Sequence, residues 1–278
     1  ELLALADTLE ALGMSVEDTS GIEAEDIDDT MLRGVADAES LIVYRLITTQ
    51  VGDAGLTIPT EAYDGDDISK DELLALADTL ESLGMSVEDT SGIEAKLIDA
   101  EMLGKVATTE SYIVKNLITS EVEDKLEVPD GAKDGEGYIT EDELLALADT
   151  LTELESEDID DVLELSGVDA SYVSVDVLKI LTESESKIVR RIVTKTLDNA
   201  LDEATISVSD DAYDTNDDFT DEELDALIVA LGILEVDSLD ELLFDKEPGD
   251  FTVNMINDIK NMDPKSYIIE AMFPGIYS

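Results

Sequence analysis

The stretch Glu1–Glu10, ELLALADTLE, decides the fold because it returns along the chain. It recurs unchanged at Glu72–Glu81, then as ELLALADTLT at Glu143–Thr152, and in a diluted form, ELDALIVALG, at Glu223–Gly232. The leucines of each copy follow the spacing of one helix face. The sequence therefore predicts an all-α chain built as a tandem array of four related units.

The spacing of the copies sets the expected unit boundaries. The first two copies start 71 residues apart (72 − 1), and within Glu1–Ala24 and Glu72–Ala95 they differ at one position, Ala11 against Ser82. We expect helical units at 1–71, 72–142 and 143–222, and a shorter terminal unit at 223–278. Each should hold three to four helices, and the array should be elongated and monomeric.

Within each unit, three further helical pieces are predicted after the leucine helix, of which the first is short (SVEDTSGI in the first unit). The leucine helix should end at Gly13 and at Gly84, since glycine adopts the left-handed conformation that closes a helix. A third helix carries pairs such as Met31-Leu32, and a fourth begins near a recurring serine. We expect the fourth helix to be capped three residues before that serine and the serine to be a small packing residue. The predicted caps are Asp37, Thr108 and Asp263, with Pro264 in the first turn.

Short linkers should join the units. The segments LTIPTEAY, LEVPDGAK and ISVSDDAY alternate in polarity, and Pro59 and Pro129 suit an edge strand. A second short piece (DDIS, GYIT or DDFT) precedes the next leucine helix. We expect the two pieces to pair as a two-stranded β-ribbon.

The end of each linker favours helix capping, with a metal site as the alternative. Ser69-x-x-Glu72, Thr140-x-x-Glu143 and Thr220-x-x-Glu223 match the capping box, which accounts for the recurring glutamate without an ion. Residues 132–143 also resemble an EF-hand loop, although Ala132 replaces the first aspartate. That resemblance implies Ca²⁺ ligands at Asp134, Glu136 and Glu143. Weak binding of divalent cations to the acidic loops is a further alternative.

Composition excludes several functions. The formal net charge is −55 and the pI about 4.1, which argues against nucleic acids and anionic membranes as partners. Cysteine and histidine are absent, which excludes disulfides, zinc sites built on these residues and imidazole bases. No apolar run is long enough to span a bilayer. We expect no enzyme and no bound cofactor.

Partner contacts are predicted on the third and fourth helices, where the first two units diverge most. Tyrosine and arginine are frequent binding anchors. The candidate residues for binding a partner are Tyr44, Arg45, Tyr112, Lys115 and Tyr267. One helix position alternates between Leu41, Tyr112, Lys187 and Tyr267, and we expect it to be half exposed.

The ELLALADTL copies, the ESxIV helix starts and the proline-containing linkers resemble the helical repeat regions of large surface proteins of Gram-positive gut bacteria. That resemblance implies an extracellular, surface-displayed fragment of a larger protein that binds a host protein, with immunoglobulin the leading candidate. The alternatives are a passive acidic stalk, stiffened by Ca²⁺, and a halophilic or acid-stable intracellular protein.

Overall fold

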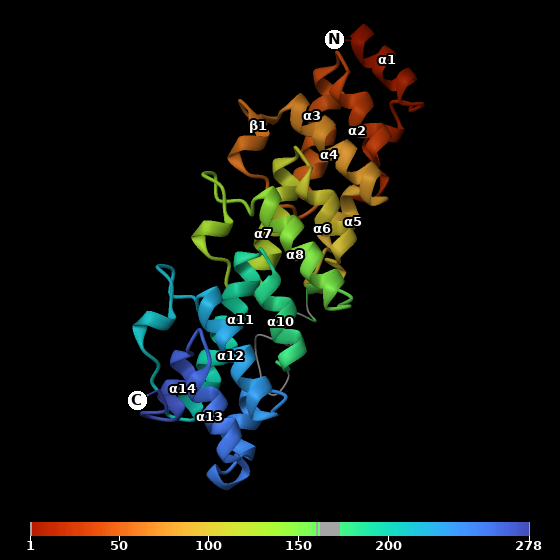
Figure 1. Ribbon diagram of the computed structural model, residues 1–278. Helices are drawn as coiled ribbons and strands as arrows, with labels where there is room; N and C mark the ends of the chain where they lie inside the picture. The colour runs from red at the N-terminus through yellow and green to blue at the C-terminus, as the bar shows by residue number, and fades with distance from the viewer. Residues whose placement is uncertain (1, 160, 162–172, 278) are drawn as a thin grey trace. The chain divides into compact units, whose positions relative to one another are not determined.

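The computed structural model describes residues 2–159, 161 and 173–277, and within them the chain is all-α apart from a two-stranded ribbon (Figure 1). Contacts divide the chain into two compact units. Unit 1 is Glu1–Lys125 with Lys133–Leu145, and unit 2 is Leu126–Ala132 with Ala146–Ser278. The finer division into four repeats stays a prediction.

Unit 1 holds the first two copies of the repeated sequence. Its α-helices are α1 (Leu2–Ala11), α2 (Asp29–Ala36), α3 (Leu41–Asp53), α4 (Lys70–Leu83), α5 (Val87–Ser91), α6 (Ala100–Ala107) and α7 (Tyr112–Lys125). Short 3-10 turns lie between them: η1 (Asp18–Ser20), η2 (Ala24–Asp26), η3 (Thr60–Ala62) and η4 (Ala95–Leu97). Helix α8 (Glu141–Glu153) contains the boundary with unit 2.

Unit 2 repeats much of this order. Its α-helices are α10 (Val175–Glu183), α11 (Lys187–Glu203), α12 (Asp221–Leu234), α13 (Val253–Asn261) and α14 (Tyr267–Met272). The shorter turns are η5 (Asp130–Ala132), η7 (Asp210–Ala212), the π-turn η8 (Glu241–Asp245) and η9 (Pro248–Asp250).

Helix α4 shows why the leucine stretch is helical. The Ser69 hydroxyl accepts a hydrogen bond from the Glu72 N–H at 3.0 Å, which caps the first turn. Leu73, Leu76 and Leu80 lie on one face and are fully buried. Gly84 closes the helix at φ +68°, and this confirms the predicted end.

The same packing recurs in both compact units. The third helix of one copy packs against the leucine helix of the next, as α2 does on α4 and α10 on α12. A backbone bond supports each pair: Val87 N–H donates to Ile27 O at 3.2 Å, and Val175 N–H donates to Asp237 O at 2.7 Å. Arg33 on α2 also donates to Asp78, and to Glu81 Oε2 at 2.5 Å. Equivalent segments of different copies thus make equivalent contacts.

The linkers differ from the predicted edge strands. Pro59 precedes η3 as its N-cap, and Ala132 N–H donates to Pro129 O at 2.9 Å, so each proline starts a tight turn. Pairing is confined to the next few residues, where β1 (Tyr63–Asp64) and β2 (Asp67–Ile68) are antiparallel. The other two linkers form single bridges, Lys133 with Ile139 and Tyr213 with Phe219. Proline has no N–H to give to a ladder, which explains why the predicted strands are short.

The cap of the fourth helix is also corrected. Ser40, Ser186 and Ser266 are themselves the N-caps of α3, α11 and α14. Their hydroxyls accept from the N–H three residues ahead, at 3.5, 3.1 and 3.1 Å. The predicted cap Asp37 instead ends α2, and Thr108 ends α6. Pro264 lies before the cap and outside the helix.

Candidate binding site

A buried carboxylate on α4 holds the first turn of α7. Glu72 is 3% exposed, and its Oε1 accepts from Ser111 Oγ at 2.5 Å and from Ile113 N–H at 3.1 Å. Its Oε2 accepts from Tyr112 N–H at 3.0 Å. The first N–H groups of a helix have no partner within the helix and carry positive partial charge. The carboxylate therefore satisfies them from a separate element, as a tertiary cap.

The same arrangement joins α12 to α14. Glu223 is 2% exposed and accepts from Ser266 Oγ at 2.6 Å, Ile268 N–H at 3.0 Å and Tyr267 N–H at 2.8 Å. We call each set, Glu72 with residues 111–113 and Glu223 with residues 266–268, a glutamate clamp. Two clamps of matching geometry place the start of the fourth helix at the same point on the leucine helix.

Burial sets the electrostatics of the clamps. It raises the pKa of Glu72 and of Glu223 above the ordinary value, while the hydrogen bonds from the helix N-terminus oppose that rise. Lys115 also lowers the pKa of Glu72 by its charge. The hydrogen bonds from the helix start thus stabilise each charged carboxylate, while its removal from water destabilises it.

The capping-box prediction is half confirmed. The hydroxyls of Ser69, Thr140 and Thr220 accept from the N–H groups of residues 72, 143 and 223, at 3.0, 3.2 and 3.1 Å. The side chains of Glu72 and Glu223, however, turn to a different helix. The recurrence of one glutamate and one serine in each copy was the available signal, but they lie 39 and 43 residues apart. No local capping rule covers such a separation.

Each of the two clamps binds the backbone of the residue that follows the recurring serine. The residue after the recurring serine is Leu41, Tyr112, Lys187 or Tyr267, and these side chains are exposed or half-buried. Leu41 is 61% exposed and Tyr267 38%. The predicted half-exposed position is confirmed, and we call it the display position.

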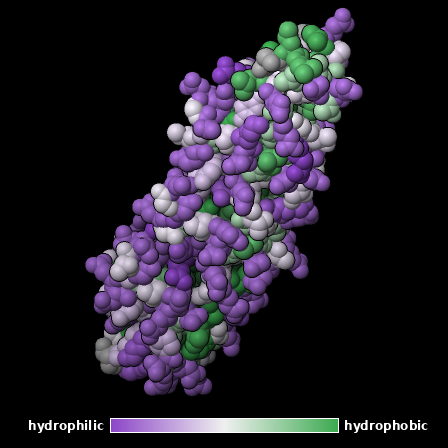
Figure 2. Space-filling view, turned by 90° about the horizontal axis from the view of Figure 1, so that it is seen from above, coloured by the Kyte–Doolittle hydropathy of each residue, from purple (hydrophilic) through white to green (hydrophobic). Residues whose placement is uncertain are grey.

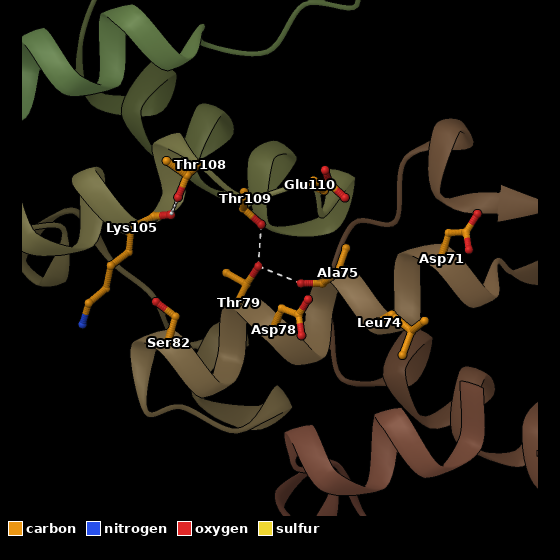
Figure 3. A pocket seen from close by; sticks show the side chains of 10 residues that line it. All are labelled: Asp71, Leu74, Ala75, Asp78, Thr79, Ser82, Lys105, Thr108, Thr109 and Glu110. Carbon is orange, nitrogen blue, oxygen red and sulfur yellow. Dashed lines mark hydrogen bonds between the residues drawn. The ribbon is translucent and has the colours of Figure 1, made fainter. Parts of the chain in front are cut away.

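Tyr112 occupies the display position beside two adjoining grooves. One, of about 620 Å³, runs along α4 and is lined by Asp71, Asp78, Lys105 and Glu110 among others. Figure 3 shows the side chains of Thr79 and Thr109, which also line this groove, joined by a hydrogen bond.

The other groove, of about 420 Å³, is lined by Tyr112 and Lys115 with Glu61, Asp71, Glu72 and Glu110. Carboxylates outnumber amines in both grooves. They therefore suit a partner with basic groups.

The Tyr112 ring is held in a defined environment. Its centroid lies 6.0 Å from that of Tyr138, and Lys115 Nζ lies 5.7 Å from it. Tyr138 is buried, and its hydroxyl donates to Glu61 Oε2 at 3.2 Å. Burial, with the charge of Glu61, raises the pKa of Tyr138 to about 12. The phenol stays neutral near pH 7 and serves as a support for the exposed ring.

The other predicted partner residues lie in different settings. Tyr44 is 7% exposed, and its hydroxyl donates a hydrogen bond to the Ile68 carbonyl in the linker. Its side chain therefore fixes the linker to α3 and cannot be an exposed anchor for a partner. Helical periodicity did not reveal this because the linker covers that face of α3. Arg45 is exposed and lies 3.3 Å from Asp67, while Lys115 is half-buried beside Tyr112. The structure brings Tyr112 and Lys115 together, but Arg45 is not among the residues that line the groove.

The structure places the three predicted calcium ligands in different settings. Asp134 Oδ1 accepts from the N–H groups of residues 136, 137 and 138 at 2.9 to 3.0 Å, which closes the loop on itself. Glu136 is exposed, whereas Glu143 is buried. Within residues 2–159, 161 and 173–277, no three acidic side chains are placed to hold a metal ion together.

In the first and third linkers, the clamps occupy the glutamate that would be bidentate in an EF-hand. Glu72 and Glu223 stand where that loop has its bidentate glutamate, and both of their oxygens are occupied by protein donors. Ala132, which replaces the first aspartate, is fully buried.

Comparison with protein-family models, with curated proteins and with solved structures gave no match. Among the described helices, none has both the length and the apolar character needed to cross a bilayer.

Proposed function

We propose that this chain is a surface-displayed binding module, made of four helical units at 1–71, 72–142, 143–222 and 223–278. It binds a host protein through the display positions and the grooves beside them. The equivalent contacts of α2 with α4 and of α10 with α12 support the repeat organisation. The resemblance to surface repeat regions of Gram-positive bacteria makes immunoglobulin the first partner to test.

The proposal is supported by the firmly held backbone at the two tyrosine display positions. The clamps bind the N–H of Tyr112 and of Tyr267 at 3.0 and 2.8 Å, so the backbone at the display position is held firmly. The side chain at that position differs among the copies: leucine, tyrosine, lysine and tyrosine. Firm backbone placement of the two tyrosines suits recognition, because rigid anchors lose little entropy on binding.

The groove beside Tyr112 indicates the chemistry of the partner. Glu61, Asp71 and Glu110 line it together with the tyrosine ring. Carboxylates attract lysine and arginine, and a tyrosine face also binds cations. The favoured partner surface is therefore basic, and the chain's large negative charge would speed the encounter at low ionic strength.

Binding is tested by capture from serum and mucosal secretion on the immobilised chain, with mass spectrometry and then affinity measurement on the captured protein. Tyr112→Ala with Tyr267→Ala should weaken binding by about tenfold or more, the size of a hot-spot loss. Tyr63→Ala is the matched control, because Tyr63 is 41% exposed and outside the display positions. Equal affinity of the double variant and the control would refute the proposal.

The alternative function is a passive spacer. The recurring contacts between copies support a spacer equally, since each copy packs against the next. Capture of no host protein, with or without a chelator, would favour the spacer.

A further inference from the structure

The first copy of the repeat exposes an apolar surface on α1 and α3. Leu2 and Leu3 are 82% and 75% exposed, and Leu41 and Ile42 are 61% and 50% exposed. Figure 2 shows hydrophobic side chains gathered at the upper right of the view. Single exposed leucines are ordinary, but a contiguous group marks an interaction surface.

The same positions are buried in the other copies. Leu2 corresponds to Leu73 and Leu224, which are 0% and 2% exposed. Ile42 corresponds to Ile113 and Ile268, which are 1% and 0% exposed. The sequence is therefore the same or similar at these positions while their environment differs.

Two elements of the preceding copy cover these positions. The third helix packs on the leucine helix, as α2 does on α4. The linker turn packs on the fourth helix, as η3 does on α7 and η7 on α14. On α1 the stripe continues through Leu5, which is half-buried, and Ala6, which is exposed, although Leu76 and Ala77 at the same register are fully buried. We call Leu2, Leu5, Ala6 and Ile42 the stacking face.

The last copy does not offer a matching surface. Its third helix, α13, exposes Asn254, Asn257 and Asp258, and of its apolar residues Val253 is exposed, at 77%. Head-to-tail docking of a second chain would set these polar groups against leucines, which is unfavourable.

We propose that the stacking face binds a further unit of this same repeat, joined ahead of Glu1 in the same polypeptide. Its third helix covers α1 and its linker turn covers the start of α3. Covalent connection follows from the linker path, because the segment that covers α7 runs from η3 through Ile68 and Ser69 directly into α4. The inference rests on the proposed repeat organisation and is independent of whether the chain binds a host protein.

The test is an extended chain in which a second copy of residues 1–71 precedes Glu1, so that the natural period is kept. Amide hydrogen exchange compares α1 of the original numbering with and without the extension. We expect the α1 amides to exchange about tenfold or more slowly in the extended chain, approaching the protection of α4.

Leu2→Glu with Ile42→Glu provides the matched control. In the unextended chain both side chains are exposed, so the double variant should leave the melting temperature unchanged. In the extended chain it should abolish the gain in α1 protection and leave exchange in α4 unaltered. The proposal is overturned if the extension leaves α1 exchange unchanged or protects the double variant equally. It is also overturned if light scattering shows that the unextended chain dimerises through this face.

Discussion

Replacing Glu72 with alanine should loosen the start of α7 and destabilise unit 1. The change leaves three donors without their acceptor: Ser111 Oγ and the N–H groups of Tyr112 and Ile113. Hydrogen bonds to a charged group contribute about 1.5–3 kcal/mol each. Removing the carboxylate also relieves its desolvation, which costs several kcal/mol and raises its pKa. The net loss in the free energy of unfolding should be about 3 kcal/mol, near the lower end of the range for breaking a buried charged contact.

Hydrogen exchange measures this loss at the atoms concerned. A loss of about 3 kcal/mol corresponds to roughly a hundredfold faster exchange at the amides of Tyr112 and Ile113. Urea denaturation followed by circular dichroism should show a lower midpoint. Glu110→Ala is the control, because Glu110 is exposed and directly precedes the clamp residue Ser111. If Glu72→Ala and Glu110→Ala exchange alike and unfold at the same urea concentration, the clamp does not stabilise the fold.

Three further predictions concern pH, helix closure and calcium. Burial raises the folded-state pKa of Glu72 and Glu223, so just above the ordinary glutamate pKa the folded chain binds more protons than the unfolded chain. The urea midpoint should therefore rise as pH falls from neutral toward that range. A midpoint that falls over the same range would contradict this prediction. Gly84→Ala should lower the free energy of unfolding by about 1–2 kcal/mol, because φ at this position is +68°. Gly104→Ala in α6, where no atom obstructs the new Cβ, should raise it by about 0.5–1 kcal/mol. Thermal denaturation of both variants checks the difference. Micromolar Ca²⁺ should leave the melting temperature unchanged relative to chelator, since Asp134 Oδ1 is occupied by N–H donors of its own loop and the buried Ala132 offers no side-chain ligand. A clear rise would restore the metal interpretation.

The sequence by itself determined the local features of this protein. Leucine periodicity predicted α4 and its equivalents, and the Ser69-x-x-Glu72 pattern predicted where α4 begins. Gly84 predicted where it ends. All of these depend on interactions within a few residues, so the pattern of residue types is enough to identify them.

Only the tertiary structure decided which partner each polar side chain takes. The side chain of Glu72 was predicted to complete a local capping box, and instead it binds a helix start 39 residues away. Tyr44 likewise donates to a carbonyl 24 residues away and is buried rather than displayed. The identical leucine helices of the first two copies carry the same residues, yet Leu2 is exposed and Leu73 is buried. Burial depends on which segment packs against a position, and that is set by contacts between segments remote in the chain.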